Sequence, residues 1–306
     1  MPILPAAPPQ PIATAGGFDY VTVDSARRRV YAAHGGASQL LIVDADAGKV
    51  LGLLTVGHTH GVAVDPASGH VYTGESGDIA GANAVSEIDP VSMQEVHRVP
   101  VGGPVDAIAY DPGLHRVYAD EDDGTRIFVI DVKTFKQIGT ITLPGHKPEY
   151  IQINPRTHEV YQNIADASEI AVIDPTTLTV KRTIATPELQ NNHPLQFDSG
   201  FDALWVMGEN NKLSLYSTTG KLLYTINFPT NVDQCSLDES RHFFACGAGG
   251  QLTLVKYGGK AAPSIVAQTS IPKGVHTLAI DPASGKIWIV WNSTTGAFVQ
   301  PFVYTP

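Results

Sequence analysis

The chain repeats one pattern seven times, and this repetition restricts its fold more than any other feature. Each copy is an alternating strand that ends in Asp or Asn, a short turn, and a second strand with an aromatic residue near its start. The residues directly before the copies are Asp19, His60, Asp106, Glu149, His193, Asp233 and His276, at intervals of 41, 46, 43, 44, 40 and 43 residues. A period of about 43 residues is typical of the four-stranded blade of a β-propeller.

Two further alternating segments fill each unit, except that the last unit ends after its third strand. The missing strand is expected at the other end of the chain, where residues 11–17 (PIATAGG) match the pattern that ends the other blades. Such an exchange closes the ring and removes an open sheet edge. The sequence therefore predicts an all-β fold, a seven-bladed β-propeller in one domain over residues 1–306. Its blades begin near 19, 60, 106, 149, 193, 233 and 276, and the N-terminal strand completes the last.

Residues 129–163 read VIDVKTFKQIGTITLPGHKPEYIQINPRTHEVYQN. This segment resembles the YVTN repeat, with its Ile-Asp step, its Leu-Pro-Gly step, its Asn-Pro turn and its Val-Tyr pair. The resemblance covers essentially the whole chain, although the fifth and sixth blades depart from the Asx-Pro and Val-Tyr steps. It implies the propeller fold. Such propellers include binding proteins, lactonase-like hydrolases, antibiotic-inactivating lyases and domains of nitrogen-oxide reductases, so the resemblance leaves the function open.

Composition narrows the set of partners. The 306 residues carry 20 basic and 30 acidic side chains, a net charge of −10, which is the wrong sign for nucleic-acid binding. No apolar run approaches the roughly 20 residues that span a bilayer, and the proline-rich N-terminus shows no signal peptide. The resemblance nevertheless implies export, so we expect a periplasmic or secreted monomer. Cys235 and Cys246 lie on consecutive predicted strands, where we expect two buried free thiols rather than a disulfide.

The seven residues that precede the copies, here called the mouth ring, are all ionisable. The first strand of each blade lies nearest the propeller axis, so these side chains should converge on one mouth of the central channel. His60, His193 and His276 are spaced three, two and two blades apart, which is close to trigonal. Three imidazoles with Glu149 predict a divalent metal ion, whether Zn, Mn, Fe or Ca, with an open position for water or substrate. A hydrated pore without an ion is the alternative.

The acidic ring residues would then do proton chemistry, with Asp106 or Asp233 as general base and with Glu149, the carboxylate partner of the ion, in the catalytic set. Turns on the same face are expected to contact a small polar substrate through Asp19, His34, His58, Glu75, Glu121, Lys147 and Trp291. Hydrolysis of an ester or lactone and elimination beside a metal-bound carbonyl both suit this set. A propeller that only binds a cationic ligand or a protein is the other function class that the sequence leaves open.

Overall fold

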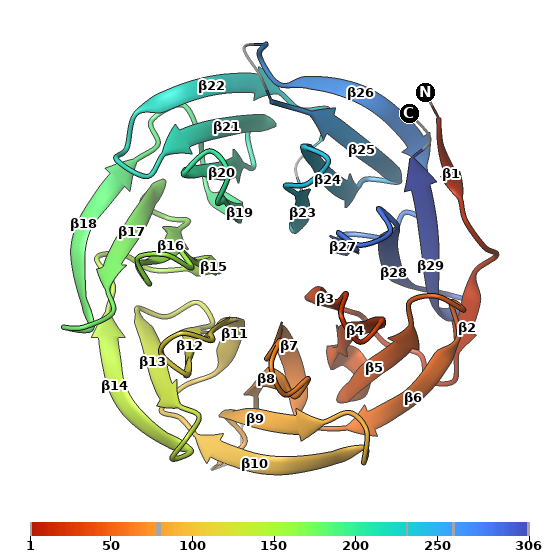
Figure 1. The fold of residues 1–306 in the computed structure, drawn as a ribbon, viewed down its shortest axis with the longest axis horizontal. Helices are drawn as coiled ribbons and strands as arrows, with labels where there is room; N and C mark the ends of the chain where they lie inside the picture. Colours follow the sequence, from red (N-terminus) through yellow and green to blue (C-terminus); the bar gives the residue numbers. More distant parts are fainter. Residues whose placement is uncertain (1, 78–80, 231, 259–260, 305–306) are drawn as a thin grey trace.

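The strands of the computed structural model form seven antiparallel sheets around a central axis (Figure 1). The structure describes residues 2–77, 81–230, 232–258 and 261–304. In these residues the helical structure is one 3₁₀ turn, η1 (Gly35–Ala37), and no helix has the length and hydropathy needed to cross a bilayer. The predicted all-β, seven-bladed propeller is therefore confirmed.

Each sheet is a blade whose first strand is innermost (Figure 1). The first strands are β3 (Val21–Asp24), β7 (His58–Val64), β11 (Val105–Asp111), β15 (Pro148–Ile153), β19 (Asn192–Asp198), β23 (Cys235–Asp238) and β27 (Leu278–Ile280). The second strands are β4 (Arg29–His34), β8 (Val71–Ser76), β12 (Arg116–Glu121), β16 (Val160–Ile164), β20 (Ala203–Gly208), β24 (Phe243–Ala248) and β28 (Ile287–Ser293). The third strands are β5 (Gln39–Asp44), β9 (Ala84–Asp89), β13 (Arg126–Asp131), β17 (Glu169–Asp174), β21 (Lys212–Ser217), β25 (Gln251–Lys256) and β29 (Gly296–Tyr304). The outer strands of the first six blades are β6 (Val50–Thr55), β10 (Gln94–Pro100), β14 (Lys136–Thr142), β18 (Thr179–Ala185), β22 (Leu222–Asn227) and β26 (Ser264–Ser270).

The N-terminal segment closes the seventh blade, as expected, but with two short strands instead of one. β1 (Ile3–Pro5) and β2 (Gln10–Ile12) both pair antiparallel with β29, which brings the two ends of the chain together (Figure 1). Consecutive prolines at positions 8 and 9 separate the two strands because proline has no N–H to donate to the sheet. The closing strand therefore lies earlier than the predicted residues 11–17, of which only the first two are in β2.

The Asp or Asn that ends the first strand of every copy has a structural role. In each blade its side-chain oxygen accepts a hydrogen bond from a backbone N–H two or three residues further on, which fixes the turn to the second strand. These residues are Asp24, Asp65, Asp111, Asn154, Asp198, Asp238 and Asp281. The fourth residue after each of them has a left-handed φ, between 50° and 82°. The most regular part of the repeat therefore serves folding rather than function.

Cys235 and Cys246 form a disulfide, so the expectation of two free thiols is wrong. They lie directly opposite each other in the register of β23 and β24, with their Cα atoms 4.4 Å apart. Both are completely buried, in the cluster that packs the fifth blade against the sixth. The register thus places the two sulfur atoms within bonding distance, which the hairpin pattern of the sequence left open.

Candidate functional site at the channel mouth

Backbone irregularities in the innermost strands bring the mouth-ring side chains to the axis. In β7 the register shifts between Thr59 and Val62, on either side of His60. Equivalent shifts occur around Asp106 in β11, at Glu149 in β15 and around His193 in β19. Such bulges interrupt the two-residue alternation and redirect a side chain, and they are frequent next to functional sites. The other three ring residues, Asp19, Asp233 and His276, lie just before β3, β23 and β27, outside the ladders.

The first group in the ring consists of Asp19, His60 and Asp106, here called the cation triad. Nδ1 of His60 lies 2.7 Å from Oδ2 of Asp19 and 3.7 Å from Oδ1 of Asp106. One ligand atom from each of the three residues lies within 4.8 Å of the other two, the spacing that a single metal ion requires. Two carboxylate oxygens and one imidazole nitrogen are suitable donors for a divalent cation.

The second group in the ring consists of Glu149, His193, Asp233 and His276. Nε2 of His193 lies 3.0 Å from Oδ1 of Asp233 and 3.4 Å from Oε2 of Glu149. Nδ1 of His276 lies 2.6 Å from the other oxygen of Asp233. Asp233 therefore joins two imidazoles, and Glu149 contacts one of them.

The predicted metal set of His60, His193 and His276 with Glu149 is not the one that the structure assembles. Within the described residues, the three imidazoles do not come together as a group that could hold one ion. The reason is electrostatic, because each imidazole pairs with a carboxylate of a neighbouring blade instead of turning toward the other imidazoles. Two of the acids that the sequence assigned to substrate binding and proton transfer, Asp19 and Asp106, take the place of the two missing histidines.

The side chains around the ring alternate between acid and base, and the alternation fails between Asp106 and Glu149. Burial, reinforced by the charges of Asp120, Asp19 and Glu149, holds the pKa of Asp106 well above its ordinary range. Burial raises the pKa of Glu149 to about 7, against the opposing effect of His193. Glu149 therefore takes up a proton near neutral pH, and Asp106 is protonated more readily than an ordinary carboxyl group.

The opposite side of the ring holds positive charge. Burial alone would lower the pKa of His193, but its hydrogen bond to Asp233 and the charge of Glu149 raise it to about 9. The hydrogen bond to Asp233 also raises the pKa of His276. Burial works against ionisation of Asp233, yet its two imidazole partners hold its pKa below the ordinary value. Asp233 is thus a carboxylate between two imidazoles whose protonated forms it favours, whereas Glu149 exchanges a proton near neutral pH.

Of the substrate contacts that the sequence predicts, His58 and Lys147 lie at the mouth. Nδ1 of His58 lies 3.0 Å from Nε2 of His60, and both rings contact the hydroxyl of Ser76. The ammonium group of Lys147 is exposed and lies 3.8 Å from Asp123. These two side chains remain candidates for contact with a ligand.

The other four predicted contacts have structural partners. His34 is buried and stacks on Phe18, with ring centroids 4.2 Å apart. Glu75 is buried against Arg98, and Glu121 forms an ion pair with Arg126. Trp291 is 5% exposed and packs in the core of the seventh blade. The expected roles of these four side chains in substrate binding find no support in this placement, because each is held away from the mouth by a packing or ionic partner.

Three residues that sequence analysis missed support the ring. Gln234 donates a hydrogen bond of 2.6 Å from Nε2 to Oδ1 of Asp19. Asp120 is buried beneath the ring, where it accepts hydrogen bonds from the backbone of Ala107 and from Gln162. Ser76 is the third. The only signal in the sequence is position, since Gln234 directly follows a ring residue and Asp120 opens an acidic run.

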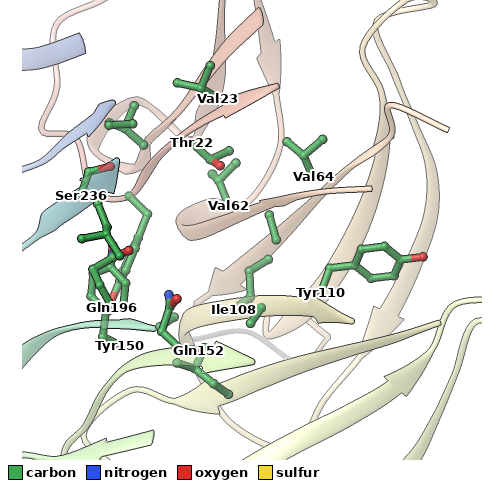
Figure 2. A pocket seen from close by; sticks show the side chains of 18 of the residues that line it. Thr22, Val23, Val62, Val64, Ile108, Tyr110, Tyr150, Gln152, Gln196 and Ser236 are labelled. Carbon is green, nitrogen blue, oxygen red and sulfur yellow. The ribbon is translucent and has the colours of Figure 1, made fainter. Parts of the chain in front are cut away.

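The residues that follow the ring positions form a floor beneath the mouth. The rings of Tyr20 and Tyr150 lie 5.2 Å apart, and Gln196 donates to the Tyr150 hydroxyl at 2.9 Å. Beyond the floor the axial channel continues as a cavity of about 420 Å³ lined by the innermost strands. Figure 2 shows Tyr150, Gln196 and Ser236 on one side of it and aliphatic side chains such as Val62 on the other. The ionisable groups are therefore concentrated at the mouth and not along the channel.

Fold and site together define a seven-bladed β-propeller with a ring of acids and imidazoles at one mouth of its channel. The sequence matches no established family profile, and no curated protein is detectably similar to it. Among solved structures, the chain is similar to a chain of Kuenenia stuttgartiensis hydrazine synthase, with a TM-score of 0.80 and 16% identity. The match covers 93% of this chain and 95% of that one. A likeness at this identity establishes the propeller fold and nothing about the reaction.

Proposed function

We propose that the chain is a metal-dependent enzyme that acts on a small polar substrate at the channel mouth, by hydrolysis of an ester or lactone or by elimination. One observation carries this proposal: the mouth ring separates into a group suited to a cation and a group suited to proton transfer. The YVTN-like repeats are consistent with it, because lactonase-like hydrolases and lyases occur among such propellers.

The cation triad would hold the ion through Asp19, His60 and Asp106. A divalent cation there would favour the ionised form of Asp106, whose pKa is raised by burial and by the neighbouring carboxylates. The far nitrogen of His60 lies 3.0 Å from Ser76, the outer hydrogen bond that usually orients a metal-bound imidazole. When bound, the ion would polarise a carbonyl oxygen and lower the pKa of a water molecule. The mixed oxygen and nitrogen donors suit Zn, Mn or Fe better than Ca.

Glu149 and His193 would move the protons. A carboxyl group whose pKa is about 7 can accept a proton at neutral pH, either from water or from a carbon next to a carbonyl group. His193, whose pKa is about 9, is protonated at that pH and stabilises negative charge that develops beside it. Asp233 holds His193 and His276 in their positions. Glu149 is therefore the proposed general base, and Asp233 is a positioning residue.

The disulfide supports the expected export from the cytoplasm. Disulfides persist mainly in oxidising compartments such as the periplasm and the extracellular space. The pairing of Cys235 with Cys246 is thus consistent with a periplasmic or secreted protein.

Elemental analysis after loading with Zn²⁺ or Mn²⁺ and gel filtration tests the metal site. We expect one ion per chain in the wild type and in His146→Ala, a control on the same face that lies outside the ring, and none in His60→Ala. If His60→Ala kept the ion, or if His146→Ala lost it as well, the assignment of the ion to the cation triad would be contradicted.

Turnover is then tested with panels of lactones, esters and hydroxy acids. Glu149→Gln should retain the ion and lose turnover. A wild type that holds the ion but turns over none of these compounds would be a binding protein, the other function class that the sequence leaves open.

A further inference from the structure

A pocket of about 250 Å³ opens beside the mouth ring, between the fifth, sixth and seventh blades. Its lining includes two ring imidazoles and one ring carboxylate together with two charged side chains from the surrounding turns. The charged and titratable members are His193, Glu209, Asp233, Lys273 and His276. The pocket therefore continues the site laterally, on the side away from Asp106.

Lys273 is the unpaired cation of this pocket. It lies in the turn between β26 and β27 and is exposed, and within the described residues no carboxylate lies within 4.0 Å of its ammonium group. Lys147, on the same face of the propeller, does have a carboxylate neighbour, Asp123, at 3.8 Å. An ammonium group at a pocket rim without an internal partner is available to an anion from solution.

The acids of the pocket are already engaged. Both oxygens of Asp233 contact imidazoles, one from His193 and one from His276. Glu209 accepts a hydrogen bond of 2.9 Å from the side chain of Asn191. The described lining of the pocket holds one lysine and two imidazoles beside two carboxylates, although the whole chain has a net charge of −10. Because both carboxylates already have partners, Lys273 is the group of this lining that can receive an anion.

The pocket and the cation triad are connected by direct contacts. Gln234, which follows Asp233 in the chain, donates a hydrogen bond of 2.6 Å to Asp19 of the triad. Its side-chain oxygen accepts a hydrogen bond from the Thr277 hydroxyl. Lys273 and His276 line the same pocket, and Asp19 of the triad precedes the next blade around the ring, so a molecule held at Lys273 lies beside His276 on the side of the triad. The volume leaves room for a few carbon atoms beyond a carboxylate group.

We infer that this pocket binds the carboxylate of the substrate, so that the substrate class is a small organic acid with an oxygen function at its other end. This inference rests on the proposed function. Lys273 and His276 provide the counter-charges for the carboxylate, and the oxygen function reaches the triad. The chemistry excludes substrates with a cationic group at this end, because they would face Lys273.

Saturation-transfer NMR with butanoate and its neutral analogue butanamide tests this inference on the full chain. We expect butanoate to bind the wild type and Lys136→Gln, an exposed lysine in the outer strand β14, equally, and to bind Lys273→Gln at least fivefold more weakly. Butanamide should bind all three weakly. Equal affinity of butanoate for wild type and Lys273→Gln, or equal binding of the acid and the amide, would overturn the inference.

The metal content of the same samples separates this test from that of the proposed function. Lys273→Gln should retain the ion, because Lys273 is not one of the three residues of the triad. Carboxylate binding without any bound ion would leave the pocket assigned and refute the metal site. A bound ion without carboxylate binding would support the metal site and refute the assignment of the pocket.

Discussion

Replacing Asp233 by Asn should lower the pKa of His193 and reduce the change in stability with pH. The carboxylate of Asp233 lies 3.0 Å from Nε2 of His193 and is the principal group that favours the imidazolium. The amide keeps the size of the side chain and removes the charge. Burial of His193 would then be opposed by Glu149 and, more weakly, by Glu209, so we expect the pKa of His193 to fall by roughly one to two units.

The magnitude follows from the pKa. Each pKa unit corresponds to about 1.4 kcal/mol, so a rise from the ordinary 6.5 to about 9 amounts to about 3 kcal/mol. Because the folded state binds this proton more tightly than the unfolded state does, the stabilisation is fully present below pH 6.5. It is lost as the pH rises through 9. Between pH 6 and pH 9, loss of the His193 contribution should therefore lower the free energy of unfolding of the wild type by about 3 kcal/mol. The decrease for Asp233→Asn should be much smaller.

Two measurements check this prediction. NMR titration of the His193 ring gives its pKa, and chemical denaturation at intervals between pH 6 and pH 9 gives the change in unfolding free energy. The control is Glu209→Gln, since that carboxylate acts on His193 only at a distance and should leave the pKa near 9. If the Asn variant also retained a pKa near 9, the assignment of Asp233 as the partner would be refuted.

Three further predictions concern the disulfide, the base and the closure of the ring. Replacing Cys235 and Cys246 together by Ser opens a loop with a sequence separation of 11 and should reduce the free energy of unfolding by about 3 kcal/mol; an unchanged denaturation midpoint would contradict this. Glu149→Gln should abolish the rise of kcat/KM near pH 7, and a persistent rise would assign the base elsewhere. Deleting residues 2–12 removes both strands that pair with β29 and should lower the melting temperature in calorimetry, whereas an equal melting temperature would show that closure is not needed for stability.

The fold could be predicted because its signals are local and repeated. The turn Asp or Asn, the two-residue alternation and the period each recur in every blade, so an error in one unit is corrected by the others. The closing strand was misplaced by several residues because it has no repeat of its own type, and Pro8 and Pro9 interrupt it. The disulfide was missed because pairing depends on register, which two cysteines on adjacent strands do not determine.

The site could be predicted in its position but not in its partners. The ring residues do lie at one mouth, because each begins the innermost strand of its blade. Which side chains then contact each other depends on charge pairing between neighbouring blades. The spacing of the histidines predicts a group of three imidazoles, whereas charge pairing brings His60 together with two acids. Turn residues such as Glu75 and Trp291 were assigned to the mouth because the sequence does not show that a partner buries them.

An odd number of blades explains why two carboxyl groups are neighbours in this ring. Alternating acids and bases can satisfy every neighbour only in a ring with an even number of positions, so a seven-membered ring must place two like groups together once. Here the mismatch falls between Asp106 and Glu149, and burial there makes ionisation of both carboxyl groups unfavourable. A cation at Asp106 would favour ionisation of that carboxyl group and leave Glu149 as the group whose pKa is about 7. The two halves of the proposed site thus meet at this mismatch, and an Asp106→Asn variant should bind less metal than the wild type in elemental analysis.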